Sequence, residues 1–292
     1  IVLFLPVFCP TIGAHLKRVY MEQPLVSVMM PVYNGIDSIE NSIKSLMLQT
    51  YQNWECIIVN DGSTDDTRFF LDGLLDERFV VHHFDLNKGR PYARQKALDL
   101  ASGKYLAMLD ADDWYFPNKL EFQVSKLELN PDISLLSGPL MLTNKKGELV
   151  CIAGVTRETI GRGMSPQITH ASSMLLMKSA KQVKYDLNLL QGEDLDFFKR
   201  FLRDDRYFMA VPECHYIYNV GDSFSLKRYI DSQILEMKYQ NSYVMPFVKI
   251  LIISLLYFLL FRDFIIRIRG RKFTSKENID YLEVKKIILD KI

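Results

Sequence analysis

Short apolar runs alternate with longer segments that carry helix signals through the first half of this chain. The apolar runs occupy residues 26–30, 55–59, 79–83, 105–109 and 133–136. The longest helix-like segments occupy residues 37–49, 89–101 and 117–130, and the first of them opens with a capping-box pattern from Asp37 to Glu40. Strands separated by helices of about 10–15 residues form βαβ units, which assemble into a parallel sheet. The pattern therefore predicts an α/β fold, a single Rossmann-like domain with a mostly parallel central sheet.

The second half of the chain has a mixed pattern, with a strand expected at 173–177 and a helix at 194–202. With 292 residues, 48% of them hydrophobic, the chain can bury one large core or one domain with an appendage. The sequence shows no internal repeat and no low-complexity linker. We therefore predict three parts: an extension outside the fold (1–23), one domain (24–228) and a C-terminal helical segment (229–292).

Polar residues stand at the ends of the first four predicted strands. They are Pro31–Asn34, Asp61–Thr64, Asn87–Arg94 and Asp110–Asp113. In a parallel sheet these ends meet at one edge, where open α/β sheets bind their ligands. The sequence lacks the glycine-rich phosphate loops G-x-G-x-x-G after the first strand and G-x-x-x-x-G-K-[ST] anywhere. The edge nevertheless offers an aromatic face, a carboxylate for a base or ribose, and cations for a diphosphate, which indicates a nucleotide-binding domain.

Three carboxylates, those of Asp110, Asp112 and Asp113, crowd into four consecutive residues. Like charges this close repel, and a hard divalent cation with oxygen ligands is the usual remedy. No arginine lies nearby in the sequence to neutralise them. The cluster therefore predicts a Mg²⁺ or Mn²⁺ site, and a solvated turn or helix cap is the alternative.

Taken in order, these segments resemble the motifs of family 2 glycosyltransferases, which have the A-type glycosyltransferase fold. The matching segments are 26–34, 59–65, 87–94, 109–113 and 192–194. The resemblance covers about residues 24–225, and five motifs in the correct order make it specific. It implies the family's fold, a nucleotide-sugar donor, a divalent metal (Mn²⁺ or Mg²⁺), and transfer with inversion of anomeric configuration.

The resemblance also implies roles for residues on the donor side. Pro31 and Tyr33 lie in the segment that contacts the nucleotide, with Tyr33 at the position that faces the base. Asp61 matches the carboxylate that reads the base, and Arg94 matches a basic residue beside the nucleotide. A strand-end aromatic, a turn aspartate and an exposed helix arginine are the plainer interpretations of Tyr33, Asp61 and Arg94.

The acidic cluster contains the D-x-D pair of the family. Asp110 and Asp112 form the pair, and Asp112 is our choice for the direct metal ligand, a role that Asp113 could share or take.

The acceptor hydroxyl needs a general base. Asp194 matches the family's base position and Glu193 is its neighbour, although acids at a helix N-terminus are also common because they favour the dipole. Weaker candidates near the sugar or the closing segment are His170, Tyr218 and Ser223–Ser225.

An apolar stretch, Phe247–Phe261, stands near the C-terminal end and is followed by a basic segment. Its uncharged part, residues 250–261, is short of the roughly 20 residues that a spanning helix needs. An apolar helix that runs into basic residues suits a helix lying on an anionic membrane surface. A buried core helix, a helical hairpin and a true span are the alternatives.

The function predicted from these features is a metal-dependent, inverting glycosyltransferase. We expect a nucleotide-sugar donor, with a UDP-sugar first, and a saccharide acceptor, preferably lipid-linked, in cell-surface polysaccharide or lipopolysaccharide assembly. A net charge of +1 gives no case for nucleic acid, and four dispersed cysteines indicate reduced thiols in the cytosol. The expected location is thus cytoplasmic, peripheral at the inner face of the cell membrane. The alternatives are a nucleotidyltransferase and an inactive, membrane-bound nucleotide-sugar binding module.

Overall fold

The computed structural model describes residues 23–220 except 145–146, 164, 166–167, 190 and 204–205. The helices in this part are α2 (Ile39–Met47), α3 (Thr67–Asp72), α4 (Arg90–Leu100), α5 (Lys119–Leu129), α6 (Met177–Val183) and α7 (Glu193–Phe201). The strands are β1 (Val26–Val32), β2 (Trp54–Asn60), β3 (Phe79–His83), β4 (Tyr105–Met108), β5 (Trp114–Tyr115), β6 (Ile133–Ser137), β7 (Leu140–Thr143), β8 (Leu149–Ala153), β9 (Thr159–Arg162), β10 (Met174–Leu176), β11 (Tyr207–Ala210) and β12 (Tyr216–Asn219).

Eight strands form the main sheet, in the order β3-β2-β1-β4-β10-β6-β11-β9. The first four strands in this order are parallel, as the sequence predicted. Strand β10 then runs antiparallel to both of its neighbours, β4 and β6, and β9 runs antiparallel to β11. The central sheet is therefore mixed, because the chain returns from β9 to insert β10 between β4 and β6.

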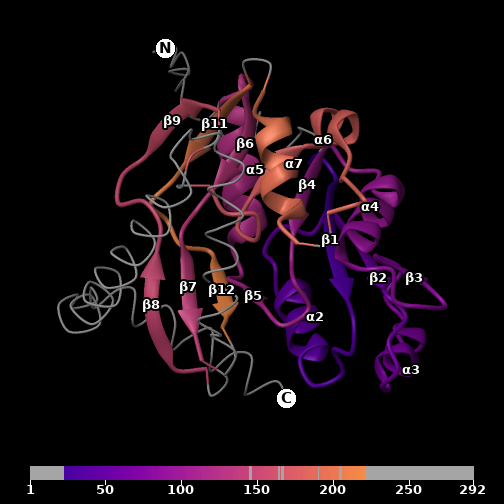
Figure 1. Cartoon of the computed structure of the whole chain (residues 1–292). Coiled ribbons are helices and arrows are strands. Elements are labelled where there is room, and N and C mark those ends of the chain that lie inside the picture. The colour runs from indigo at the N-terminus through magenta and orange to yellow at the C-terminus, as the bar shows by residue number, and fades with distance from the viewer. Residues whose placement is uncertain are drawn as a thin grey trace, which may run out of the picture.

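A second sheet of four strands, ordered β5-β12-β7-β8, was not expected from the alternating pattern. The short strand β5 follows the acidic cluster directly, and it pairs antiparallel with β12. On its other side β12 runs parallel to β7. Figure 1 shows β12 (orange) between β5 and β7. This pairing brings the chain near residue 216 against residues 114–115.

The side chains of the central strand β1 pack in two hydrophobic cores, one on each face of the sheet. Val28 and Met30 pack in one core with residues of α2 and α5, whereas Met29 packs in the other with residues of α4 and α7. Side chains alternate between the faces of a strand, which produces this division. Helices thus cover both faces, as a buried parallel sheet requires, and Figure 1 shows α4, α6 and α7 grouped together.

The start of helix α2 differs from the prediction. The predicted capping box began at Asp37, but the residue that precedes the helix is Ser38. No side-chain hydrogen bond caps the helix there, so the predicted capping box is wrong. Glu40 instead forms an ion pair of 2.8 Å with Lys44, one turn further along the helix. The carboxylate is therefore bound on the helix surface and does not cap the backbone N–H groups before the helix.

Within the described ranges, no helix is long and apolar enough to cross a membrane. The apolar stretch Phe247–Phe261 lies outside these ranges, as do residues 1–22.

The loops that follow β2 and β3 meet at Gly62. This glycine has a φ of +68°, and a Cβ at this position would lie 2.4 Å from the carbonyl carbon of Leu86 and 2.5 Å from the nitrogen of Asn87. Glycine is suited to both conditions, because it has no Cβ and adopts positive φ without steric cost. The close approach places Asp61 beside the loop that precedes α4.

We predict that Gly62→Ala destabilises the protein more than Gly163→Ala does. Both glycines have positive φ, but a Cβ at Gly163 (φ +71°) would meet no atom within 4 Å. Each substitution should cost about 1–2 kcal/mol of left-handed strain, and Gly62→Ala about 1–3 kcal/mol more for the backbone clash. Urea unfolding of the two variants measures the difference, and equal destabilisation would show that the two loops are not in close contact.

Candidate active site

Asp61 ties the end of β2 to the loop before α4. Its backbone N–H donates to the carbonyl oxygen of Val32 (2.8 Å), the last residue of β1. Its buried carboxylate accepts the backbone N–H of Lys88 at Oδ1 (2.8 Å) and that of Gly89 at Oδ2 (2.9 Å). The predicted base-reading carboxylate therefore also holds the loop 87–89 in place.

The loop after β1 carries the predicted aromatic contact. Tyr33 is 49% exposed, and Pro31 is half-buried in β1. Asn34 adopts a φ of +50°, which asparagine tolerates better than most residues, and its Oδ1 accepts the N–H of Thr64 (2.8 Å). Its own N–H donates to Ser63 Oγ (2.9 Å), so the loops after β1 and β2 are bound to each other. Tyr33 is thus an exposed ring on a well-fixed loop.

The acidic cluster forms a tight turn directly after β4. The turn closes with a hydrogen bond from the N–H of Asp113 to the carbonyl oxygen of Asp110 (3.1 Å). Asp113 is buried, and its Oδ2 accepts the hydroxyl of Tyr216 (2.7 Å) while its Oδ1 accepts the N–H of Asn219 (2.8 Å). The same Tyr216 hydroxyl accepts the N–H of Asp110 (3.2 Å). Asp112 differs from Asp113 because its side chain is exposed.

Crowding makes this turn electrostatically costly. Although Asp112 is exposed at the surface, the protein groups around its carboxylate partly desolvate it, and together with the charge of Asp110 they raise its pKa. Burial raises the pKa of Asp113 well above its ordinary value, and the charges of Asp110 and Asp112 add to the effect. A positive charge placed beside the turn would therefore be favourable.

An arginine that is distant in the sequence lies beside this turn, contrary to the expectation that no arginine neutralises the cluster. Arg94, on α4, is 2% exposed, and its guanidinium lies 3.5 Å from Asp110 Oδ1 and donates to Glu193 Oε1 (2.7 Å). Burial opposes its charge, but the carboxylates of Asp110, Asp194 and Glu193 outweigh burial and raise the pKa of Arg94. The guanidinium therefore faces protein carboxylates and joins the two acidic motifs.

The two candidate bases occupy different environments at the start of α7. Glu193 is buried, and burial raises its pKa although Arg94 acts in the opposite direction. Asp194 is half-buried, and its Oδ1 accepts the N–H of Leu195 (2.8 Å). Gly192 precedes the helix with a φ of +73°, the left-handed conformation that glycine favours. Asp194 is thus the more accessible of the two acids.

The weaker candidates fall into two groups. His170 is buried and hydrogen-bonds through Nε2 to the hydroxyl of Tyr185 (2.9 Å), and burial together with the nearby Arg94 lowers its pKa well below the usual range. His170 therefore lies within the core, among residues such as Tyr185 and Phe198. Tyr218 is half-buried in β12, next to Asn219, which bonds to Asp113, and burial together with the charge of Asp113 raises its pKa to about 12. Residues Ser223–Ser225 lie outside the described ranges.

Sequence reasoning missed Tyr216. It is fully buried, and its hydroxyl contacts groups that are 103 and 106 residues away in the chain. In the sequence it is an ordinary strand aromatic, and only the pairing of β12 with β5 brings it to the turn. No local signal could have identified it.

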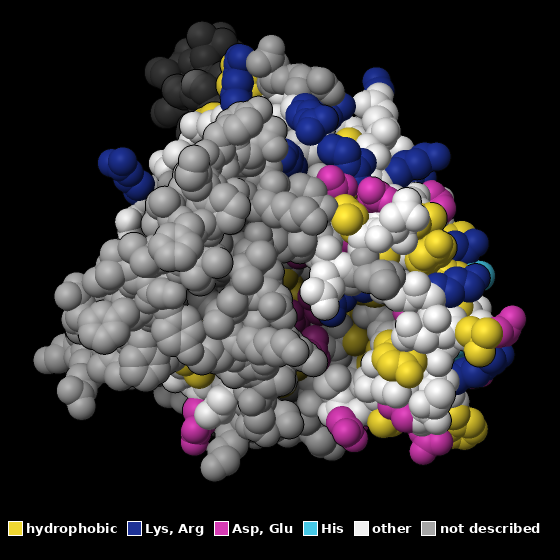
Figure 2. Space-filling view, in the orientation of Figure 1, with side chains coloured by type: hydrophobic (Ala, Val, Ile, Leu, Met, Phe, Trp, Pro, Cys, Tyr) yellow, Lys and Arg dark blue, Asp and Glu magenta, His cyan; other side chains and the backbone are white. Residues whose placement is uncertain are grey.

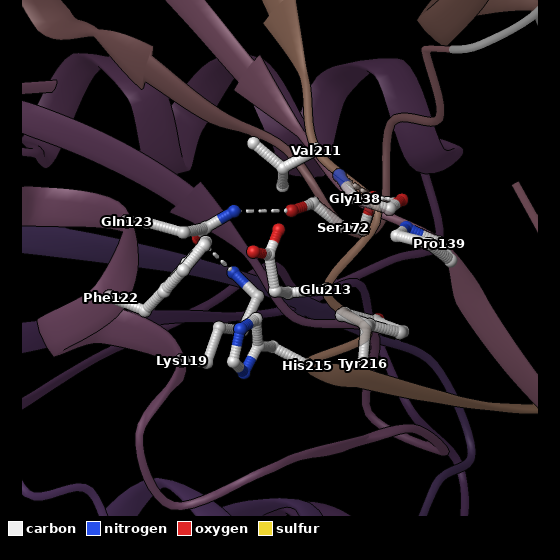
Figure 3. A pocket seen from close by; sticks show the side chains of 10 residues that line it. All are labelled: Lys119, Phe122, Gln123, Gly138, Pro139, Ser172, Val211, Glu213, His215 and Tyr216. Atoms are coloured by element: carbon white, nitrogen blue, oxygen red, sulfur yellow. Dashed lines mark hydrogen bonds between the residues drawn. The ribbon is translucent and has the colours of Figure 1, made fainter. Parts of the chain in front are cut away.

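A small cavity of about 10 Å³, room for roughly one water molecule, is lined in part by Tyr216 (Figure 3). On its wall the buried ammonium of Lys119 donates to Gln123 Oε1 (2.6 Å), and Gln123 donates to the carbonyl oxygen of Ser172 (2.8 Å). Burial lowers the pKa of Lys119 to about 7. The cavity is too small for a nucleotide and contains none of the predicted donor residues, so we place the candidate site at the sheet edge.

The residues at the edge fit a divalent cation that is coordinated partly by protein carboxylates and partly by a phosphate group. In the part of the chain that the structure describes, no group of three or more His, Cys, Asp or Glu is arranged to hold a metal. Mg²⁺, however, is usually held by one or two carboxylates together with phosphate oxygens and water. The exposed Asp112, with Asp110 beside it, suits this mode of binding.

Comparison with known proteins places these motifs in a family. The sequence profile described as "Glycosyl transferase family 2" matches residues 27–140. The uncharacterized glycosyltransferase MJ1057 of Methanocaldococcus jannaschii is 32% identical over 202 residues, which cover 66% of this chain and 70% of that protein.

Two relatives with more specific names match shorter segments. The Escherichia coli UDP-Glc:alpha-D-GlcNAc-diphosphoundecaprenol beta-1,3-glucosyltransferase WfgD is 41% identical over 124 residues, 42% of this chain and 49% of that protein. The putative teichuronic acid biosynthesis glycosyltransferase TuaG of Bacillus subtilis is 46% identical over 104 residues, 35% of this chain and 41% of that protein. The chain thus matches less than half of the length of each of these two relatives.

Solved structures show the same fold. TarS of S. aureus in complex with UDP-GlcNAc aligns with a TM-score of 0.59 at 17% identity and covers 90% of this chain and 80% of that chain. TarS in complex with UDP aligns with a TM-score of 0.56 at 20% identity and covers 75% of this chain and 66% of that chain. The α/β fold of the A-type glycosyltransferase kind, expected from the motifs, is therefore confirmed, with a mixed central sheet.

Proposed function

Because this chain belongs to the family 2 glycosyltransferases, we propose that it transfers a sugar from a nucleotide-sugar donor to a saccharide acceptor with inversion of configuration. The observation that carries the proposal is the bridge from Arg94 to both acidic motifs, Asp110 on one side and Glu193 on the other. The acidic turn can then bind the diphosphate through a cation, and the acids at the start of α7 can accept the proton of the acceptor hydroxyl. A UDP-sugar is the preferred donor, since WfgD is named for UDP-Glc and TarS was solved with UDP and UDP-GlcNAc.

The nucleotide binds, in this proposal, across the loops after β1 and β2. The exposed ring of Tyr33 offers a stacking face for the base, beside Pro31. Asp61 accepts one backbone N–H at each oxygen, and a carboxylate has about four lone-pair sites, so it can also accept from the base. Arg94 holds the acidic motifs in position, in place of the direct nucleotide contact that the resemblance implied.

The diphosphate binds at the acidic turn, where Asp112, with Asp110 beside it, would hold Mg²⁺ or Mn²⁺. When bound, the cation supplies Lewis-acid stabilisation of the charge that develops on the leaving group. Asp113 was also expected to be a ligand, but each of its oxygens accepts a protein hydrogen bond. We therefore assign Asp113 to shaping the turn and Asp112 to the ligand role.

The acceptor hydroxyl loses its proton to Asp194 as the sugar is transferred. Asp194 is half-buried at the start of α7, where it is accessible to an incoming hydroxyl. Glu193 is buried and bound to Arg94, so it orients the start of the helix instead of taking the proton. The accessible acid and the buried acid thus have separate tasks.

Asp112→Asn should weaken Mn²⁺-dependent UDP binding by about 10–100-fold, the usual range for a lost contact to a charged group, and transfer should fall with it. Asp132→Asn is the matched control, because Asp132 is an exposed carboxylate that precedes β6. UDP-induced thermal shifts with MnCl₂ and with EDTA measure the effect. Full wild-type transfer in EDTA, or equal behaviour of the two variants, would contradict the cation role.

Asp194→Asn should leave UDP-sugar affinity near that of the wild type while transfer falls about 10²–10⁴-fold, the usual loss of a general base. Asp196→Asn is the control in the same first turn of α7, because Asp196 is bound to Arg200 (2.6 Å) and takes no part in the proposed chemistry. Steady-state transfer rates and donor titrations separate chemistry from binding. Normal turnover by Asp194→Asn would assign the base to another group.

We further propose that the acceptor is lipid-linked, in cell-surface polysaccharide assembly, and that the protein acts at the inner face of the cell membrane. The names of WfgD and TuaG, which specify a diphosphoundecaprenol acceptor and teichuronic acid biosynthesis, support the acceptor class. Figure 2 shows Lys and Arg side chains gathered over α6 and α7. Among the exposed basic residues there are Lys178, Lys181, Lys184 and Arg203. Each basic residue contributes about 1 kcal/mol near an anionic leaflet.

The full chain should therefore sediment with vesicles of phosphatidylglycerol and phosphatidylcholine, and much less with phosphatidylcholine alone. Deletion of residues 246–292 should reduce sedimentation severalfold, since it removes the apolar stretch Phe247–Phe261 and the basic segment after it. The UDP-induced thermal shift should persist, because every donor motif lies upstream. Unfolding of the truncated protein would instead indicate a core helix, and absence of sedimentation by the full chain would remove the membrane proposal.

A further inference from the structure

The hydroxyl of Tyr216 binds both ends of the acidic turn. It accepts the N–H of Asp110 (3.2 Å) at the start of the turn and donates to Asp113 Oδ2 (2.7 Å) at its end. The N–H of Asn219, from the same strand β12, donates to the other oxygen of Asp113 (2.8 Å). Residues of β12 thus make three hydrogen bonds to the two ends of the turn. Asp112, between these ends, is exposed.

Tyr216 itself is firmly fixed. Its side chain is fully buried, and its strand pairs with β5 on one side and β7 on the other. Its ring packs edge-on against Tyr115 at 5.6 Å between centroids, and the ammonium of Lys119 lies 4.2 Å above the Tyr115 ring. A ring held in this way cannot change its position without disturbing both sheets. The hydroxyl is therefore a preorganised support for the turn.

The turn needs such a support because its own charges oppose it. Asp110, Asp112 and Asp113 stand within four residues, and like charges at this spacing favour an open chain over a tight turn. A neutral hydroxyl that donates to one end and accepts from the other stabilises the closed turn without adding charge. Partners of this kind orient the groups that bind a metal, and their loss commonly weakens metal binding by about 10–100-fold.

We propose that Tyr216 is a positioning residue for the cation and diphosphate site: through Asp113 and the N–H of Asp110 it sets the direction of Asp112. This assignment rests on the proposed function, since it takes Asp112 as the cation ligand. Tyr216 touches neither donor nor acceptor, and it acts only through the shape of the turn. The ligand class concerned is a divalent cation bound together with a nucleoside diphosphate.

The chain offers a matched control for this proposal. Tyr115 is also fully buried, contacts the Tyr216 ring, and donates its hydroxyl to the carbonyl oxygen of Met108 instead of the acidic turn. Tyr216→Phe and Tyr115→Phe therefore remove the same atom from the same layer of the core. If Tyr216 only stabilised the fold, the two variants would have the same Mn²⁺ requirement for UDP binding.

The experiment uses the full chain and follows the UDP-induced thermal shift as Mn²⁺ is titrated. In Tyr216→Phe the Mn²⁺ concentration for half-maximal stabilisation should rise about 10–100-fold, whereas Tyr115→Phe should stay within about threefold of the wild type. Electron paramagnetic resonance of Mn²⁺ in the presence of UDP checks the binding directly. UDP binding in EDTA should be equal in all three proteins.

If Tyr216→Phe and Tyr115→Phe need equal Mn²⁺ concentrations while the wild type binds UDP in a Mn²⁺-dependent way, the positioning role of Tyr216 is overturned and the cation proposal stands. A wild type whose UDP binding ignores Mn²⁺ would overturn the cation proposal and this assignment with it. If Tyr216→Phe does not fold, Asp113→Asn replaces it, because an amide keeps the shape of the side chain but puts an NH₂ group in place of one of the two oxygens that accept from Tyr216 and Asn219. An unchanged Mn²⁺ requirement in Asp113→Asn would likewise overturn the assignment.

Discussion

A buried positive charge organises the functional edge of this protein. Arg94 is almost completely buried, and an unpaired charge at that depth costs several kcal/mol. Glu193 and Asp110 compensate it, so helix α4, helix α7 and the end of strand β4 must all be in place together. The Nε of Arg94 has no hydrogen-bond partner within the described part of the chain. The guanidinium charge therefore depends on these two carboxylates for its compensation. Formation of the site and completion of the fold are therefore coupled.

Environment then separates neighbouring carboxylates into buried ones bound to protein groups and more accessible ones. In the acidic turn, Asp113 is buried and bound to protein donors, whereas its neighbour Asp112 is exposed. The same arrangement recurs at the start of α7, where Glu193 is buried against Arg94 and Asp194 is accessible. Each motif thus pairs an inner acid that fixes geometry with an outer acid that can meet a ligand.

Local patterns in the sequence were enough to predict half of the main sheet. The apolar runs that became β1, β2, β3 and β4 were confirmed as parallel neighbours, and polar clusters follow these strands as expected. The insertion of antiparallel β10 and the second sheet were not predicted, because strand order depends on contacts between distant segments. The capping box of α2 was predicted and is wrong, since Glu40 binds Lys44 instead.

The sequence by itself therefore determined the α/β class, the parallel half of the sheet, and which kinds of side chain stand at its edge. Those features follow from the strand and helix periods and from turn residues, all of which act over a few neighbouring positions. Only the tertiary structure decided that Arg94 neutralises Asp110 and binds Glu193, and that Tyr216 holds Asp113. These partners are 16, 99 and 103 residues apart, and the order and register of the strands decide whether they meet. Periodicity determines which face of a strand a residue occupies, but it carries no information about the neighbour on that face.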